Sequence, residues 1–200
     1  MITLGKHKLV LASKSPRRNE LLKGLGVEFT VRTKDTDESF PGHMDPFEVA
    51  GFLSKKKADA FFDELAVDEI LITADTVVIL DEEILNKPAD KSEAFEMIAS
   101  LSGKTHHVVT GITIGSGSNH VTLQDTVKVH FKTLSSEEIN YYIEAFQPFD
   151  KAGAYGIQEW IGYVAVDRIE GSFYTVMGLP VHLVYEELKK ITLLTSQFES

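Results

Sequence analysis

The chain has 200 residues, of which 43% are hydrophobic, and a formal net charge of -10 at pH 7. This length is enough for a sizeable core, and the negative charge disfavours binding to nucleic acids or anionic membranes, which depends on neutralising phosphates. There is no cysteine, which excludes disulfides, thiolate zinc sites and cysteine nucleophiles. No segment has the apolar length of a membrane span or of a signal peptide, so we expect a soluble cytoplasmic protein.

Apolar runs alternate with helical patterns through most of the chain, which predicts an α/β fold. Strands are predicted at residues 8–12, 28–32, 70–80, 108–114 and 121–131, the last two forming a hairpin. Helices are predicted at residues 16–25, from 45–46 onward, and at 91–101, 135–146 and 181–189. We expect one domain over residues 1–200, divided into two lobes.

The stretch "LASKSPRR" places two cations at the start of a predicted helix. With Ser15 as the N-cap and Pro16 in the first helical position, Arg17 and Arg18 fall in the first turn. Cations there are unfavourable because the helix dipole is positive at this end. A bound polyphosphate would reverse that cost, since backbone N–H groups and guanidinium groups would converge on its oxygens. The alternative is an ordinary capped helix with two solvated arginines, and the local pattern leaves both open.

One carboxylate, Asp75, interrupts the apolar strand "ILITADTVVIL". A carboxylate in a buried strand is costly unless it is paired, bound to metal or facing a cleft. A catalytic base or metal ligand is favoured over the alternative, a structural aspartate at a bulge. Thr76 should point to the opposite face if the strand is regular.

Three lysines follow one another in "SKKKADAFF", and only Lys57 is placed to reach inward from the helix. Lys55 and Lys56 fit a solvated face. Lys87 is held in an extended conformation by Pro88, although a single lysine in a turn is usually only solvated. Glu38 lies in a polar loop and is uninformative by itself.

An ordered set of motifs identifies the chain as resembling the Maf family of nucleoside triphosphate pyrophosphatases. The motifs are "LASKSPRR", "KA" at Lys57, "ADTVV", "NKPAD", "LSGKTHHVVTG", "DKAGAYGIQ" and "IEGSFYTVMGLP". The resemblance implies a mixed, twisted sheet flanked by helices, with a central cleft between two lobes, related to the inosine triphosphate pyrophosphatases. It also implies hydrolysis of a nucleoside triphosphate to the monophosphate and pyrophosphate, a divalent cation, Mg²⁺ or Mn²⁺, and a homodimer.

The resemblance assigns roles to individual residues of this chain. We expect Asp75 to be the catalytic base or to hold the metal, with help from Glu38. The residues expected to bind the triphosphate are Ser13, Arg17, Arg18, Lys57 and Lys87. Arg17, Thr76 and Gln158 are similar to the branch that prefers dTTP and UTP, with modified pyrimidine triphosphates as further candidates, whereas the branch acting on 7-methyl-GTP typically lacks that threonine and glutamine.

The amide of Gln158 offers both a donor and an acceptor, which matches the edge of uracil or thymine. The alternative is that Gln158 bonds the backbone of its own loop. For the whole protein, the alternative to an enzyme is a nucleotide-sensing regulator linked to cell division that binds without turnover. Retention of Asp75 beside the cations favours the enzyme, because an anion binder gains nothing from a nearby carboxylate without a metal.

Overall fold

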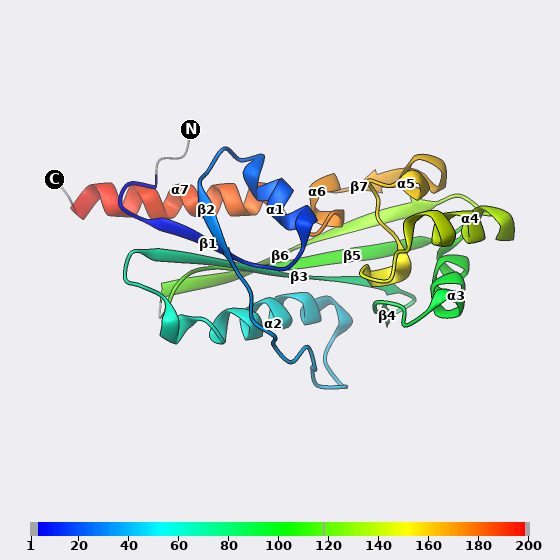
Figure 1. Ribbon diagram of the computed structural model, residues 1–200, viewed down its shortest axis with the longest axis horizontal. Helices are drawn as coiled ribbons and strands as arrows, with labels where there is room; N and C mark the ends of the chain where they lie inside the picture. The colour runs from blue at the N-terminus through cyan, green and yellow to red at the C-terminus, as the bar shows by residue number, and fades with distance from the viewer. Residues whose placement is uncertain (1–3, 118, 199–200) are drawn as a thin grey trace.

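The computed structural model describes residues 4–117 and 119–198 and contains one seven-stranded sheet of order β2-β1-β3-β5-β6-β7, with β4 also paired to β3 (Figure 1). The strands are β1 (Lys8–Ala12), β2 (Phe29–Arg32), β3 (Glu69–Leu80), β4 (Glu83–Leu85), β5 (Thr105–Ser116), β6 (Asn119–Phe131) and β7 (Val166–Glu170). β1 runs parallel to β2 and β3, and the other pairs are antiparallel. The α/β class with a mixed sheet is therefore confirmed.

The helices begin at the capping residues that the sequence marks. Ser15, Asp45, Asp90 and Ser135 each accept a backbone hydrogen bond at a helix start. The helices are α1 (Pro16–Lys23), α2 (Pro46–Asp59), α3 (Lys91–Leu101), α4 (Ser136–Phe146), α5 (Trp160–Ala165), α6 (Phe173–Val176) and α7 (Val181–Phe198). α1 ends two residues earlier than predicted, and α7 continues well beyond residue 189. None of the helices in the described ranges is long and apolar enough to cross a bilayer.

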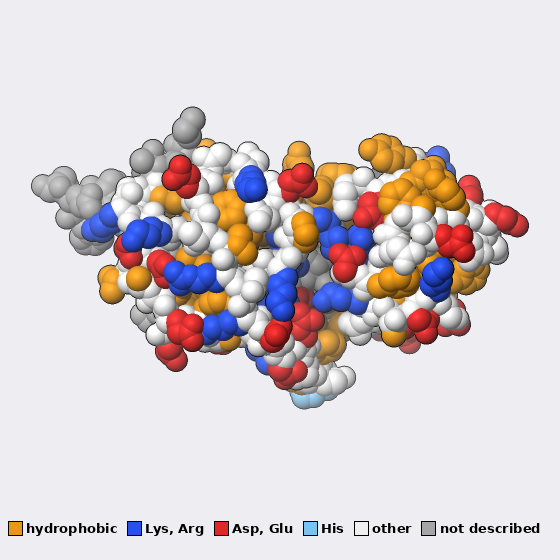
Figure 2. Space-filling view, viewed as in Figure 1, with side chains coloured by type: hydrophobic (Ala, Val, Ile, Leu, Met, Phe, Trp, Pro, Cys, Tyr) orange, Lys and Arg blue, Asp and Glu red, His pale blue; other side chains and the backbone are white. Residues whose placement is uncertain are grey.

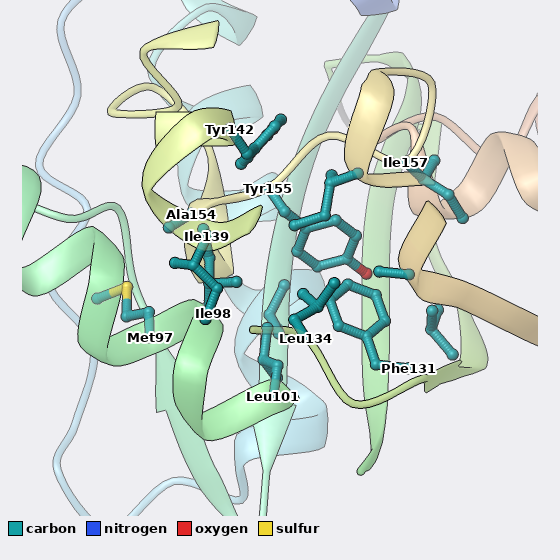
Figure 3. Close-up of a cluster of buried hydrophobic side chains, with 14 of the residues drawn as sticks. Met97, Ile98, Leu101, Phe131, Leu134, Ile139, Tyr142, Ala154, Tyr155 and Ile157 are labelled. Atoms are coloured by element: carbon teal, nitrogen blue, oxygen red, sulfur yellow. The ribbon is translucent and has the colours of Figure 1, made fainter. Parts of the chain in front are cut away.

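Helices cover both faces of the sheet. α2 lies on one face, α1, α6 and α7 lie on the other, and α3, α4 and α5 gather at one end (Figure 1). One core cluster joins β1 and β3 to α1 and α7 through side chains such as Leu11, Leu22 and Leu188. A second cluster lies under α3 and α4, where Figure 3 shows the rings of Phe131 and Tyr155 close together, with centroids 5.0 Å apart. Burying a leucine or phenylalanine side chain completely in such a cluster stabilises the fold by about 1.5–3 kcal/mol.

One edge of β3 has a gap in its strand pairing. β1 pairs with residues 69–72 of this edge and β4 pairs with residues 78–80, while β5 occupies the other edge. Within the part of the chain that the structure describes, no strand therefore pairs with residues 73–77 on the side of β1 and β4. This gap places Asp75 and its neighbours beside the loop that leads from β1 into α1.

Candidate active site

A cleft of about 930 Å³ opens beside the gap in β3. Figure 2 shows a hollow near the middle of this face, where acidic and basic side chains gather. Seven cations line the cleft, namely Lys14, Arg17, Arg18, Lys34, Lys57, Lys87 and Lys151. Four carboxylates line it, namely Asp35, Glu38, Asp75 and Asp150. The lining therefore carries an excess of three positive charges in a chain whose net charge is -10, which suits a small polyanion.

The loop before α1 holds two serines in a compact turn. Ser13 Oγ accepts a hydrogen bond from Ser15 N at 3.1 Å, and Ser15 Oγ accepts one from Arg18 N at 3.4 Å. Ser13 is buried and lines the cleft. Because Ser13 Oγ is the acceptor in its bond with Ser15, its hydroxyl hydrogen can still be donated to another group. Arg17 Nη1 lies 3.1 Å from Asp150 Oδ2, so the first cation of α1 has an anionic partner across the cleft.

Arg18 makes three contacts inside the protein. Its Nε donates to Gly178 O at 2.8 Å, its Nη1 to Ala74 O at 2.9 Å and its Nη2 to Thr76 Oγ1 at 3.1 Å. Burial lowers the pKa of Arg18, and the nearby charge of Asp75 opposes that shift, but a guanidinium stays charged. The two cations of the first turn are thus held by protein partners, and the alternative of two solvated arginines is wrong.

Two carboxylates meet at the ammonium of Lys57. Lys57 Nζ lies 2.5 Å from Asp75 Oδ1 and 2.7 Å from Glu38 Oε1, and Lys87 Nζ lies 3.5 Å from Glu38 Oε2. Burial would raise the pKa of Glu38, but the charges and hydrogen bonds of Lys57 and Lys87 outweigh it and hold that pKa below its usual value. Lys55 and Lys56 instead pair with the exposed carboxylates of Asp59 and Asp37.

β3 is regular through Asp75, because its pairing with β5 runs without a break from Leu71 to Ile79. The alternative of a structural aspartate at a bulge is therefore wrong. Thr76 lies on the face opposite to Asp75, as a regular strand requires, and contacts Arg18 rather than α2.

A glycine opposite Asp75 lets α2 approach the sheet closely. Gly111 pairs with Asp75 in the register of β5 and β3. A Cβ atom on Gly111 would lie 2.4 Å from the backbone of Ala50 in α2, which no side chain can do. Lys57 lies two turns after Ala50 on the same helical face. The close packing at Gly111 therefore brings Lys57 within reach of Asp75.

The segment from Asp150 to Glu159 closes the other side of the cleft. Lys151 is buried, with Nζ 2.8 Å from Asp150 Oδ1 and 3.1 Å from Glu159 Oε1. Gln158 lines the cleft, and its Oε1 is buried without a hydrogen-bond partner in the described part of the chain. Its carbonyl oxygen therefore does not bond its own loop.

Sequence reasoning missed Asp150 and Lys151 as cleft residues. Both lie in the motif "DKAGAYGIQ", which is the only signal that could have found them. The partner of Asp150, Arg17, is 133 positions away along the chain. The remaining expected residues, Ser13, Lys87 and Thr76 among them, all line the same cleft.

The chemistry of the cleft suits a hard divalent cation, although no group of three His, Asp or Glu side chains that could hold one occurs among residues 4–117 and 119–198. Asp75 and Glu38 supply carboxylate oxygens that converge on one point, now at Lys57 Nζ. Mg²⁺ typically takes one or two carboxylates and completes its shell with water and substrate phosphates. The donor set therefore fits a metal that arrives with a nucleotide.

Known proteins resemble this chain along most of its sequence. The chain is 49% identical over 189 residues to a dTTP/UTP pyrophosphatase of Bacteroides thetaiotaomicron, covering 94% of this chain and 98% of that protein. It is 51% identical to a dTTP/UTP pyrophosphatase of Porphyromonas gingivalis, covering 93% and 95%. Among solved structures, the Staphylococcus aureus Ham1 protein matches 62% of this chain and 71% of its own, with 14% identity and a TM-score of 0.46. The model of the Maf-like protein family matches residues 8–191, and the chain therefore belongs to the Maf-like protein family.

Proposed function

We propose that this chain is an enzyme that hydrolyses dTTP and UTP to the monophosphate and pyrophosphate. The observation that carries the proposal is the placement of the Asp75 carboxylate within a cleft whose lining is otherwise dominated by cations. A polyphosphate would bring its α-phosphorus to such a carboxylate while the cations neutralise its charge. The relatives named dTTP/UTP pyrophosphatase support the same reaction and the same substrates.

In the proposed reaction, a water molecule attacks the α-phosphorus and Asp75 accepts its proton. The new bond joins the water oxygen to that phosphorus, and the bond to the oxygen bridging the α- and β-phosphates breaks, so that pyrophosphate leaves. Lys57 contacts Asp75 Oδ1, which leaves Oδ2 for the water. Positioning and charge stabilisation supply most of the rate, because this chemistry asks little covalent work of the protein.

The triphosphate would bind along the start of α1 and the lysines across from it. Ser13 has a hydroxyl hydrogen to donate, and Arg17 and Lys87 are exposed enough to turn toward a ligand, with side chains that are 25% and 56% exposed. Arg18 would stabilise the triphosphate mainly through its positive charge, since three of its N–H groups already contact the protein. Asp75 and Glu38 would hold Mg²⁺ or Mn²⁺, which when bound supplies charge stabilisation and lowers the pKa of a coordinated water.

The base would be recognised by Gln158. Its buried Oε1 needs a donor, and the N3–H of uracil or thymine is one. Its Nε2 can donate to a carbonyl next to that N3–H. Cytosine has an unprotonated N3 and presents an acceptor there instead, so CTP would leave Oε1 facing a lone pair. A site built to bond a polar edge rejects such mismatches strongly.

The decisive experiment is a pyrophosphate-release screen with the purified chain and Mg²⁺ or Mn²⁺. It should compare dTTP, UTP, CTP, the purine triphosphates and 7-methyl-GTP. We expect dTTP and UTP to have the highest kcat/KM. Tight UTP binding without pyrophosphate release over a long incubation would instead favour the nucleotide-sensing regulator, and equal rates on UTP and GTP would contradict the base assignment.

We also propose that the enzyme works in the cytoplasm as a homodimer. β7 pairs with β6 only from Lys128 to Phe131, so the outer edge of β6 before Lys128 has no strand partner within the described residues. An open edge of this length offers backbone groups to a second copy. A monomer mass in light scattering at micromolar concentration would contradict the dimer.

A further inference from the structure

A chain of hydrogen bonds leads from Thr76, at the cleft, into the interior of the protein. Thr76 Oγ1 lies 3.0 Å from Thr110 Oγ1, and Thr110 Oγ1 lies 2.8 Å from the carbonyl oxygen of Thr175. Thr110 and Thr175 are fully buried, while Thr76 is partly buried and lines the cleft. The three residues come from β3, β5 and α6.

The hydrogen atoms in this chain can point in only one direction. A carbonyl oxygen only accepts, so Thr110 donates its single hydroxyl hydrogen to Thr175 O. The bond between Thr76 and Thr110 must then use the hydrogen of Thr76. Thr76 Oγ1 also accepts from Arg18 Nη2 at 3.1 Å. Thr76 therefore keeps one lone pair for a ligand and has no hydrogen to give.

Because the Thr76 hydroxyl can only accept a hydrogen bond, the group of the bound nucleotide that contacts it must be a donor. Ionised phosphate oxygens also only accept, so Thr76 would repel them rather than bind them. Thr76 therefore faces the nucleoside and not the triphosphate. At assay pH, dTTP carries two polar hydrogen-bond donors, the N3–H of the base and the 3′-hydroxyl of the sugar.

The cleft offers Thr76 Oγ1 and the buried Gln158 Oε1 as two acceptors for these two donors. If Gln158 takes the N3–H, as the proposed function states, the 3′-hydroxyl remains for Thr76. We propose that Thr76 accepts a hydrogen bond from the sugar 3′-hydroxyl, and that Thr110 is the positioning residue that holds Thr76 in its accepting orientation. Every nucleoside triphosphate with an intact 3′-hydroxyl offers this contact, so Thr76 would position the nucleotide and leave the choice of base to Gln158.

The first test uses the unmodified protein and three substrates. dTTP, 2′,3′-dideoxythymidine triphosphate and 3′-fluoro-3′-deoxythymidine triphosphate share one base, and only dTTP can donate from the 3′ position. We expect kcat/KM to fall on the order of tenfold for both analogues, which is the scale of one lost hydrogen bond. An analogue hydrolysed as well as dTTP would overturn the proposal. Absence of pyrophosphate release from dTTP itself would overturn the proposed function, so the two failures are distinguishable.

The second test measures, in variants of Thr110, the ratio of kcat/KM for dTTP to kcat/KM for 3′-fluoro-3′-deoxythymidine triphosphate. In Thr110→Val the hydrogen of Thr76 is free to turn toward the 3′-fluorine, which can only accept, so this ratio should fall toward one. Thr110→Ser keeps the hydroxyl and should show the same ratio as the unmodified protein. A merely structural role of Thr110 would not require the serine variant to keep the ratio that the valine variant loses.

The matched control is Thr113→Val, another buried threonine of β5, whose hydroxyl contacts Ser54 and Thr122 instead. This variant should keep the unmodified ratio. The proposal is overturned if Thr110→Val also keeps it, or if Thr113→Val loses it equally.

Discussion

Lys57 Nζ lies 2.5 Å from Asp75 Oδ1 and 2.7 Å from Glu38 Oε1, so one ammonium joins two carboxylates from a strand and a distant loop. The side chains of Lys57 and Asp75 are only 16% and 12% exposed, which makes this contact much less screened than a surface pair. The ammonium offsets the repulsion between two carboxylates that a divalent cation would otherwise have to offset alone. A nucleotide arriving with its metal would meet both carboxylates already assembled.

Asp75→Asn keeps the shape of the side chain and removes its ability to take a proton. We expect kcat for pyrophosphate release from dTTP to fall by about 10²–10⁴-fold, the usual contribution of a general base. The control is Asp59→Asn, which breaks a lysine pair on the exposed side of α2 and should leave the rate within about twofold. Wild-type activity of Asp75→Asn would remove this residue from the chemistry.

Glu38→Gln removes one of the two carboxylates proposed to hold the metal. We expect the Mg²⁺ concentration needed for half-maximal rate to rise by about tenfold or more, because a neutral amide attracts the cation less than a carboxylate does. A metal titration of the pyrophosphate-release rate measures this directly. Glu64→Gln, at a carboxylate that pairs with Lys34 and is 65% exposed, should not change the titration.

Arg18→Lys tests the three contacts of a partly buried guanidinium. An ammonium cannot reach Gly178 O, Ala74 O and Thr76 Oγ1 together, so at least one of these three oxygens loses its donor. We expect the free energy of unfolding, measured with urea, to fall by about 1–3 kcal/mol. Arg168→Lys, where the guanidinium pairs with Glu170 on the surface, should change it by less than about 0.5 kcal/mol. Equal effects of the two substitutions would contradict a special role for Arg18.

Local signals predicted most of the fold. The caps at Ser15 and Asp45, the prolines after them and the apolar run of β3 are all written in contiguous sequence. β4 and β7 were missed because they are short and partly exposed, and so carry little alternation of apolar and polar residues. Their strand state depends on pairing with β3 and β6, which contiguous sequence does not reveal.

The site was harder to predict because its contacts join distant parts of the chain. Arg18 and Gly178 are 160 positions apart, and Arg17 and Asp150 are 133 positions apart. The sequence predicted that two cations at the start of a helix need an anionic or hydrogen-bonding partner. It could not say that part of this need is met by the backbone carbonyl of Ala74 at an open edge of β3, since that edge exists only once β1 and β4 have paired with β3.

Gln158→Glu should alter base choice more than rate. A carboxylate keeps an acceptor for the N3–H of uracil or thymine but loses the Nε2 donor for the neighbouring carbonyl. We expect the preference for UTP over CTP, as a ratio of kcat/KM, to fall by about tenfold or more, while kcat on UTP falls less. Gln147→Glu, at an amide that bonds the carbonyls ending α4, is the control and should leave the ratio unchanged. An unchanged ratio in Gln158→Glu would remove that residue from base recognition.

His106 should make the fold sensitive to acid. Burial, helped by the charges of His107 and His130, lowers the pKa of His106 to about 3, against about 6.5 for an unfolded chain. The unfolded state therefore takes up a proton first as the pH falls. The stability from neutral His106 is complete above about pH 6.5 and is lost toward pH 3, at up to about 1.4 kcal/mol per pH unit. Urea unfolding at pH 7, 6 and 5 should show a smaller decline for His106→Gln than for the unmodified chain. His43→Gln, at an exposed histidine, should decline like the unmodified chain, and equal declines in all three proteins would refute this assignment.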